Sequence, residues 1–146
     1  MRQILFRGKC FGNKEWIKDG EWVEGLPMYT ANKSEKGKID RILTLRDGYY
    51  SILLVCPETV CQYTGLTDKT GRKIFENDII ECKRNNQHFQ SQIEWDSMCG
   101  GFMFQDTKEG SAVGLDALLS CGIYNDFKLI GNIFDNSELI GADKQG

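Results

Sequence analysis

The chain has 146 residues and a formal net charge of −3, with 40% hydrophobic and 27% charged residues, which is typical of a folded globular protein and argues against extended disorder. Sixteen glycines against two prolines, with 11% aromatic residues, favour many short strands joined by glycine turns over a helical bundle. The longest apolar run, ILLVC at 52–56, is much shorter than the roughly 18 residues of a membrane-spanning helix. The opening residues, MRQILFRGKCFG, contain too short an apolar stretch for a signal peptide, so we expect a cytoplasmic protein without membrane contact.

Two Asp-Gly pairs predict two β-hairpins in the N-terminal part of the chain, because this dipeptide tolerates the positive φ angles of a two-residue turn. In EWIKDGEWVEG the turn is Asp19-Gly20, and large side chains of the two arms are expected to face one another. In RILTLRDGYYSILLV the turn is Asp47-Gly48, and the apolar second arm is typical of a strand covered on both faces. The polar segment 30–38 between the hairpins is expected to be a mobile loop.

The C-terminal part of the chain is typical of further short strands with one helical turn. The segment FQSQIEWD alternates apolar and polar residues with a period of two, which indicates a half-buried strand. Residues 106–114 are polar and contain glycine, as in a loop. The other expected elements are a strand at 78–83, a turn and strand at 99–105, a closing strand at 127–134 and a helical turn at 115–120.

These elements together predict a mainly β fold with at most short helical turns. An N-terminal β-hairpin region, residues 1–59, is expected to pack on a small SH3-like β-barrel formed by residues 60–140. Residues 141–146 are expected to be a disordered tail.

Charge and cysteine spacing argue against several classes of site. Residues 1–59 carry ten Lys/Arg and eight Asp/Glu, and residues 60–146 carry eight and thirteen, which gives net charges of +2 and −5. An acidic second half weakens the electrostatic attraction to nucleic acid. The six cysteines, which are expected to be reduced, include no C-x-x-C pair, and neither of the common phosphate-binding glycine motifs occurs. The sequence therefore indicates no catalytic residue, no cofactor and no metal.

The stretch QYTGLTDKTGRKIFENDII at 62–80, followed by FKLIGNIFDNSELI at 127–140, resembles the YopX family of phage and prophage proteins. The N-terminal ILFRGKCFGNKEW is similar to the opening of that family. Asn77 stands where the family pattern has glycine, and asparagine is the residue that best replaces glycine at a positive φ. The resemblance implies a mainly β protein encoded by mobile genetic elements of bacteria, and it implies no reaction. The motif positions expected to form a turn-rich scaffold are Gln62, Tyr63, Thr64, Gly65 and Gly71.

The motif also carries carboxylates that could converge on a divalent metal ion. Asp68, Glu76 and Asp78, with Glu81 beyond them, lie within fourteen residues, as a metal-dependent phosphodiester hydrolase would require. The favoured interpretation is structural: apolar residues follow Asp78 at once, so this side chain is expected to enter a strand and accept hydrogen bonds from nearby backbone amides.

A second candidate site is the turn that follows the strand at 78–83. Lys83, Arg84 and His88, with Gln90 beside them, could contact nucleic acid, although a solvated turn is the favoured interpretation. His88 is the chain's single histidine, so it cannot supply a multi-histidine metal site.

We therefore predict a protein of phage or prophage type, located in the cytoplasm of a bacterial host, that acts as a non-enzymatic protein-interaction module. Its expected partners are a second copy of itself, paired through the apolar hairpin arms with free strand edges, or a phage or host protein. The alternatives are a carboxylate-metal hydrolase and a nucleic-acid-binding accessory protein, with nucleic acid the less favoured partner.

Overall fold

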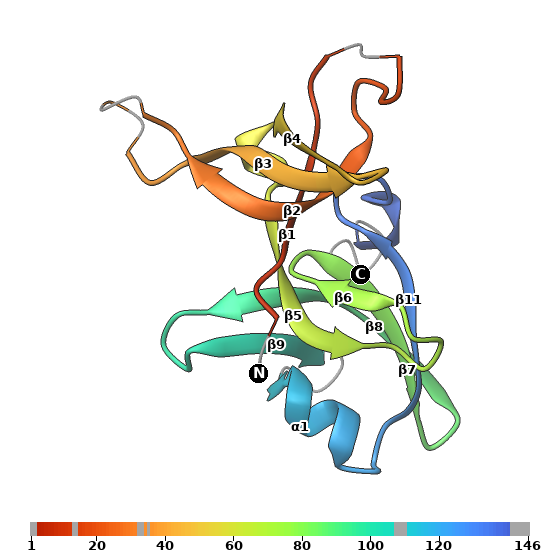
Figure 1. The fold of residues 1–146 in the computed structure, drawn as a ribbon. Coiled ribbons are helices and arrows are strands. Elements are labelled where there is room, and N and C mark those ends of the chain that lie inside the picture. The colour runs from red at the N-terminus through yellow and green to blue at the C-terminus, as the bar shows by residue number, and fades with distance from the viewer. Residues whose placement is uncertain (1–2, 13–14, 32–33, 35, 107–110, 141–146) are drawn as a thin grey trace. The chain divides into compact units, whose positions relative to one another are not determined.

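The structure is a computed structural model that describes residues 3–12, 15–31, 34, 36–106 and 111–140. The chain divides into two compact units, Met1–Tyr63 and Thr64–Gly146 (Figure 1). Both units are built mainly from antiparallel strands, so the prediction of a mainly β fold is confirmed. No helix in the described part of the chain is long and apolar enough to cross a membrane. The segment 141–146, expected to be a disordered tail, lies outside the described residues.

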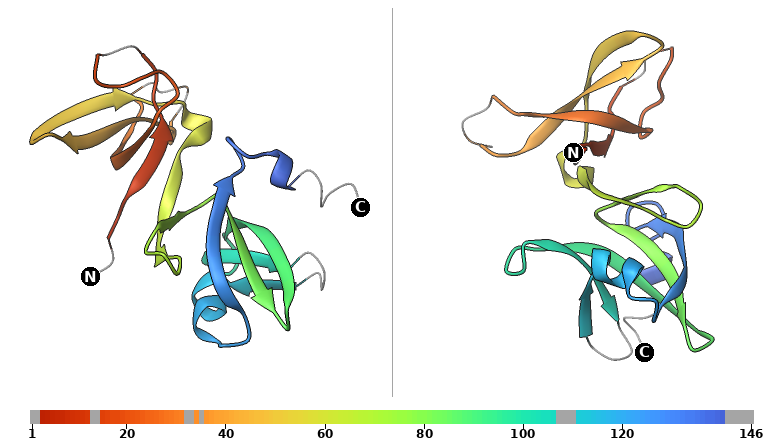
Figure 2. Two further views of the ribbon diagram at one scale, coloured as in Figure 1. Left: turned by 90° about the vertical axis from the view of Figure 1, so that its right-hand side faces the viewer. Right: turned by 60° about the horizontal axis from the view of Figure 1, so that its bottom comes forward.

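The first unit is an antiparallel sheet in the strand order β4-β3-β2-β1-β5. Its strands twist strongly, as the orange and yellow ribbons of Figure 2 show. The last of these strands, β5, continues into the second unit, where it pairs with β6 (Lys73–Phe75). The strands are β1 (Phe6–Lys9), β2 (Trp22–Tyr29), β3 (Ile39–Arg46), β4 (Tyr49–Leu54) and β5 (Cys61–Thr67), with a 3-10 turn at Pro57–Thr59.

One face of the first sheet, which we call the inner face, covers a small apolar core. Val23, Ile42 and Leu53 on β2, β3 and β4 are buried there together with Cys10, Ile17 and Val55. Because side chains alternate along a strand, the neighbouring residues of each strand point to the opposite face. The apolar side chains that alternate with Val23, Ile42 and Leu53 along these strands therefore lie outside this core.

The hairpin predicted at Asp47-Gly48 is confirmed. Asp47 has φ 51° and Gly48 has φ 82°, the two positive values that a type I′ turn requires. The flanking residues Arg46 and Tyr49 pair directly, which sets the register of β3 against β4.

The hairpin predicted at Asp19-Gly20 is wrong. A turn does form there, closed by the Glu21 N–H donating to the Lys18 carbonyl over 3.1 Å, but only Gly20 has a positive φ. The partner of β2 is β1, because Cys10 exchanges backbone hydrogen bonds with Glu21 and Gly20. The predicted loop at 30–38 joins β2 to β3, and its residues 32, 33 and 35 lie outside the described residues.

The second unit contains an antiparallel sheet in the order β10-β9-β8-β7-β11 and one short helix. The strands predicted within 78–105 and at 127–134 are confirmed, as is the helical turn at 115–120. The predicted loop at 106–114 is wrong at its end, where β10 pairs with β9, and residues 107–110 lie outside the described part. The elements are β7 (Asp78–Arg84), β8 (Gln87–Asp96), β9 (Gly101–Asp106), β10 (Ser111–Gly114), α1 (Leu115–Ser120) and β11 (Asn125–Asn132).

The SH3-like barrel predicted for residues 60–140 is not confirmed, since the described strands form open sheets. The reason lies in β8, which pairs with β7 through Gln87–Gln92 and with β9 through Ile93–Asp96. One long strand thereby joins two hairpins, and β10 and β11 remain at opposite edges of the described sheet.

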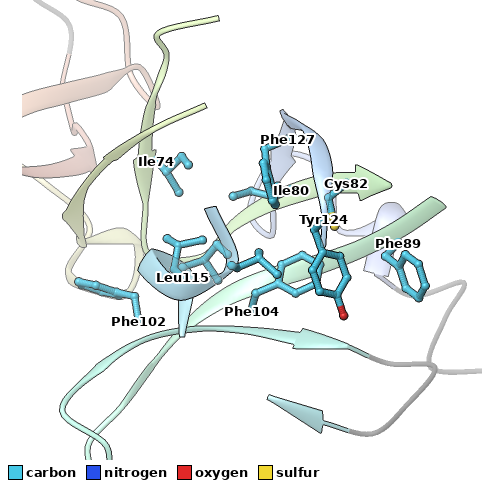
Figure 3. Packing of buried hydrophobic residues seen from close by; sticks show 11 residues of the cluster. Ile74, Ile80, Cys82, Phe89, Phe102, Phe104, Leu115, Tyr124 and Phe127 are labelled. Carbon is cyan, nitrogen blue, oxygen red and sulfur yellow. The ribbon is translucent and has the colours of Figure 1, made fainter. Parts of the chain in front are cut away.

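The core of the second unit is larger and rich in aromatic rings (Figure 3). Ile93 and Phe104, a cross-strand pair, are fully buried, and Leu115 and Leu118 of α1 cover them. Tyr124 meets Phe89 edge-on with ring centroids 6.0 Å apart. This core fixes β7 and β8, on which the predicted site residues Asp78, Lys83, Arg84 and His88 lie.

Candidate interaction surface

The first half of the motif builds turns and strand pairing. Gln62 pairs with Phe6 of β1, and the Tyr63 N–H donates to the Leu5 carbonyl over 2.8 Å. The Thr64 hydroxyl donates to the Ile74 carbonyl over 2.7 Å, which ties β5 to β6. The two glycines of the motif, Gly65 and Gly71, have φ of 86° and 85°, values that L-residues rarely adopt.

Asp68 organises the loop between β5 and β6 from a buried position. Its Oδ1 accepts hydrogen bonds from the Thr70 N–H, the Thr70 hydroxyl and the Arg72 N–H, at 2.9, 2.7 and 3.0 Å. Its Oδ2 accepts a bond from the Leu129 N–H at 3.1 Å, so the same carboxylate holds β11. Burial alone would raise the pKa of Asp68, but these hydrogen bonds outweigh it and hold the pKa below its ordinary value.

The turn between β6 and β7 uses Asp78 and Asn77 in the same structural way. The Asp78 Oδ2 accepts a bond from the Phe75 N–H at 2.7 Å, and the residue is 1% exposed. Asn77 has φ 67°, and its side-chain oxygen accepts a bond from the Gln92 amide at 2.9 Å. Glu76, at the tip of the turn, is half-buried, and desolvation raises the pKa of its carboxyl.

The carboxylates of the motif therefore serve separate turns. Asp68 bonds across to β11, whereas Asp78 bonds back to Phe75 at the start of its own turn. Among the described residues, no group of three or more His, Cys, Asp or Glu side chains is placed to hold a metal ion.

The basic tip predicted at β7 and β8 does come together in space, but acidic groups are mixed into it. His88 lies beside Glu81, with Nδ1 and Oε1 3.2 Å apart, and the Gln90 amide donates to the other oxygen of Glu81 over 3.1 Å. These two hydrogen bonds, that of Gln90 first, hold the pKa of Glu81 below its ordinary value. Lys83 lies 3.4 Å from Asp126.

The remaining cation of the tip, Arg84, interacts with an aromatic side chain. Its guanidinium contacts the Tyr124 hydroxyl at 3.4 Å and lies 5.6 Å from the centre of that ring. The tip thus presents cations that already face carboxylates or a tyrosine.

A large apolar surface lies on the face of the first sheet that is opposite its core, and we call it the outer face. The register places Leu26 beside Leu43, Leu43 beside Ile52, and Leu45 beside Tyr50, so these side chains form rows across β2, β3 and β4. Each of five residues is between 52% and 75% exposed, far more than the buried residues of the inner face. The five are Leu26, Leu45, Tyr50, Ile52 and Leu54.

This surface corrects the prediction that the second hairpin arm is covered on both faces. Only Leu53 of β4 is buried, while the apolar residues on either side of it are exposed. β4 is also the edge strand of the sheet, and its sequence YYSILL has neither a charged residue nor a proline, the features that usually protect an edge. Sequence reasoning missed the outer face because a continuous apolar run does not reveal which of its residues will be covered.

Charged residues border the outer face at its ends. On β2, Glu24 precedes Leu26, and on β3, Arg41 pairs with Met28 and Leu54. Arg7 and Lys9 of β1 lie over the Trp22 ring, at 4.6 and 5.4 Å from its centre. The apolar rows therefore have a polar rim that carries both signs of charge, as protein-binding surfaces do.

Comparisons with known proteins give one family and one fold. The family model described as YopX protein matches residues 5–141. Among solved structures, the chain is similar to protein EF1440 from Enterococcus faecalis, with a TM-score of 0.55 and 24% sequence identity over 96% of this chain and 99% of that chain. At this identity the likeness shows the fold alone. No curated protein matches the chain.

Proposed function

The chain belongs to the YopX family, and on that premise we propose that it is a non-enzymatic protein-interaction module of phage or prophage type that acts in the cytoplasm of a bacterial host. Its binding surface is the outer face of β2, β3 and β4. The carboxylates of the family motif support a non-enzymatic role, because Asp68 and Asp78 accept hydrogen bonds from backbone N–H groups and act as structural residues of turns.

The observation that carries the proposal is the exposure of the outer face. The exposed fractions of its five residues correspond to roughly 600 Å² of accessible surface, which is the upper end of the patch sizes found on monomeric proteins. Surfaces of this size with a polar rim generally mark a binding site, because apolar area left in water is costly and is gained back on association.

The chain supplies a matched pair of residues for testing this surface. Tyr49 and Tyr50 are adjacent, are 76% and 75% exposed, and point to opposite faces of β4 because side chains alternate along a strand. A Tyr50→Ser variant alters the outer face, and a Tyr49→Ser variant removes the same chemical group from the other side.

The experiment is affinity capture of the tagged chain, after nuclease treatment, from a host lysate that also contains an untagged copy. We expect a protein, either the untagged copy or another chain, to be retained by the wild type and by Tyr49→Ser and to be lost with Tyr50→Ser and Ile52→Asp. The proposal would be overturned if Tyr50→Ser and Ile52→Asp retain the same protein as the wild type, or if nuclease treatment abolishes the capture.

A further inference from the structure

We propose that the outer face is occupied by a second copy of this chain, so that two sheets pack face to face about a twofold axis. This inference rests on the proposed function and names its partner. Two properties of the outer face support it: its area and the absence of charge within its apolar rows.

The area suits a dimer. Stable protein interfaces bury about 1,200–2,000 Å² in total, or about 600 Å² or more from each partner. The five exposed residues of the outer face supply roughly that amount from one copy. Leu43 and Met28 also lie on the outer face, and because each is partly exposed they add to this area. Two copies thus reach the lower end of the range without any contribution from the second unit.

The apolar chemistry of the outer face suits a partner whose surface is also apolar, such as a second copy of the same face. The rows Leu26–Leu43–Ile52 and Leu45–Tyr50 contain no charged residue, so a charged peptide would find no complementary group within them. An identical apolar face satisfies them fully, since two twisted sheets pack with their strands about 30° apart and interdigitate their side chains. In a twofold arrangement each contact also occurs twice.

The charges at the rim are compatible with a twofold pair. Glu24 lies on one side of the Leu26–Leu43 pair along the strands, and Arg41 lies on the other side. A twofold axis that crosses the strands at this pair reverses the strand direction of the second copy. It therefore brings the Glu24 end of one face over the Arg41 end of the other. Each end carries both signs of charge, because Arg7 pairs with Glu24 in register and Arg41 lies 3.2 Å from Asp40, so no end of a single sign meets its like.

The test is sedimentation velocity and light scattering on the purified, untagged full chain at about 50 μM, a concentration that saturates a dimer of micromolar Kd. We expect a dimer for the wild type and for Tyr49→Ser. Tyr50→Ser should weaken dimerisation at least about tenfold, and Ile52→Asp, which places two carboxylates near one axis, should abolish it. Circular dichroism should show that every variant is folded, because the altered side chains are exposed.

Two results would overturn the inference: a monomeric wild type at this concentration, or a dimer that survives both outer-face variants. The lysate capture separates these failures from failure of the proposed function. A monomer whose outer face still captures another protein overturns only the second copy as the partner, whereas a monomer with no face-dependent capture overturns both proposals.

Discussion

At the scale of single residues, Asp68 shows how much of the motif is structural. Replacing Asp68 by Asn retains an oxygen for the Thr70 and Arg72 donors, but it turns an NH₂ group towards the Leu129 N–H, where two donors then oppose each other. We expect Asp68→Asn to lower the free energy of unfolding at neutral pH by about 2 kcal/mol, the usual value of a hydrogen bond to a charged group. Urea unfolding followed by tryptophan fluorescence measures this difference.

The lowered pKa of Asp68 also predicts how the loss depends on pH. Its folded-state pKa lies below the unfolded value of about 3.9, so the stabilisation is fully present above that value and is lost as the pH falls through the folded pKa. The gap between wild type and Asp68→Asn should be constant from about pH 7 to 5 and should narrow below about pH 4. Glu94→Gln, which alters an exposed carboxylate of β8, is the control, and a gap that persists unchanged into acid would contradict the assignment.

Asn77 tests the one departure from the family pattern. Its φ of 67° costs an ordinary L-residue about 1–2 kcal/mol, and its side chain also accepts the bond from Gln92. We expect Asn77→Ala to lower the free energy of unfolding by about 2 kcal/mol and Asn77→Gly to cost less, because glycine restores the backbone and loses only the side-chain bond. Equal losses in urea titrations of the two variants would show that the backbone is not strained.

At the scale of elements, the β3–β4 hairpin depends on its turn. Gly48 has φ 82° with open space around it, so Gly48→Ala strains the backbone without a collision. Gly101 at the start of β9 also faces open space but has no positive φ, which makes Gly101→Ala a matched control. We expect a loss of about 1 kcal/mol for the first variant and none for the second. Thermal unfolding of the two variants measures this difference in stability, and equal melting temperatures would count against a type I′ turn.

The elements that could be predicted from the sequence are those whose determinants are local. Asp47-Gly48 specifies its own turn, and the alternation in FQSQIEWD identifies β8. The first predicted hairpin failed because a distant residue, Cys10, provides the backbone partners for Gly20 and Glu21. The SH3-like barrel is not confirmed for a similar reason: β8 divides its length between β7 and β9, and the periodicity of its sequence does not reveal this division.

The candidate site likewise has one part that local sequence predicts and another part that depends on packing. The structural role of Asp68 and Asp78 followed from their positions beside turns, which is local information. The outer face depends on which side of β4 the core lies, and Leu53 is the residue of β4 that is buried on that side. An apolar strand gives no signal of this choice, so the surface that carries the proposed function could be found only from the packing.

At the scale of the whole molecule, each compact unit has a core of its own. Ile42 is fully buried among residues of the first unit, and Phe104 is fully buried among residues of the second. Ile42→Ala and Phe104→Ala each leave a cavity, which should cost about 2–5 kcal/mol in the unit concerned. Amide hydrogen exchange read by mass spectrometry can locate that loss along the chain.

We expect Ile42→Ala to speed exchange in β2, β3 and β4 and to leave β7, β8 and β9 close to wild type, and Phe104→Ala to do the reverse. The physical reason is that protection depends on the local free energy of opening, and the two cores have no buried residue in common. Uniform acceleration across both units in either variant would instead mean that β5, which runs through both, makes them unfold as one. In that case a substitution on the outer face would change the stability of the motif region as well, and the exchange data on Tyr50→Ser would show it directly.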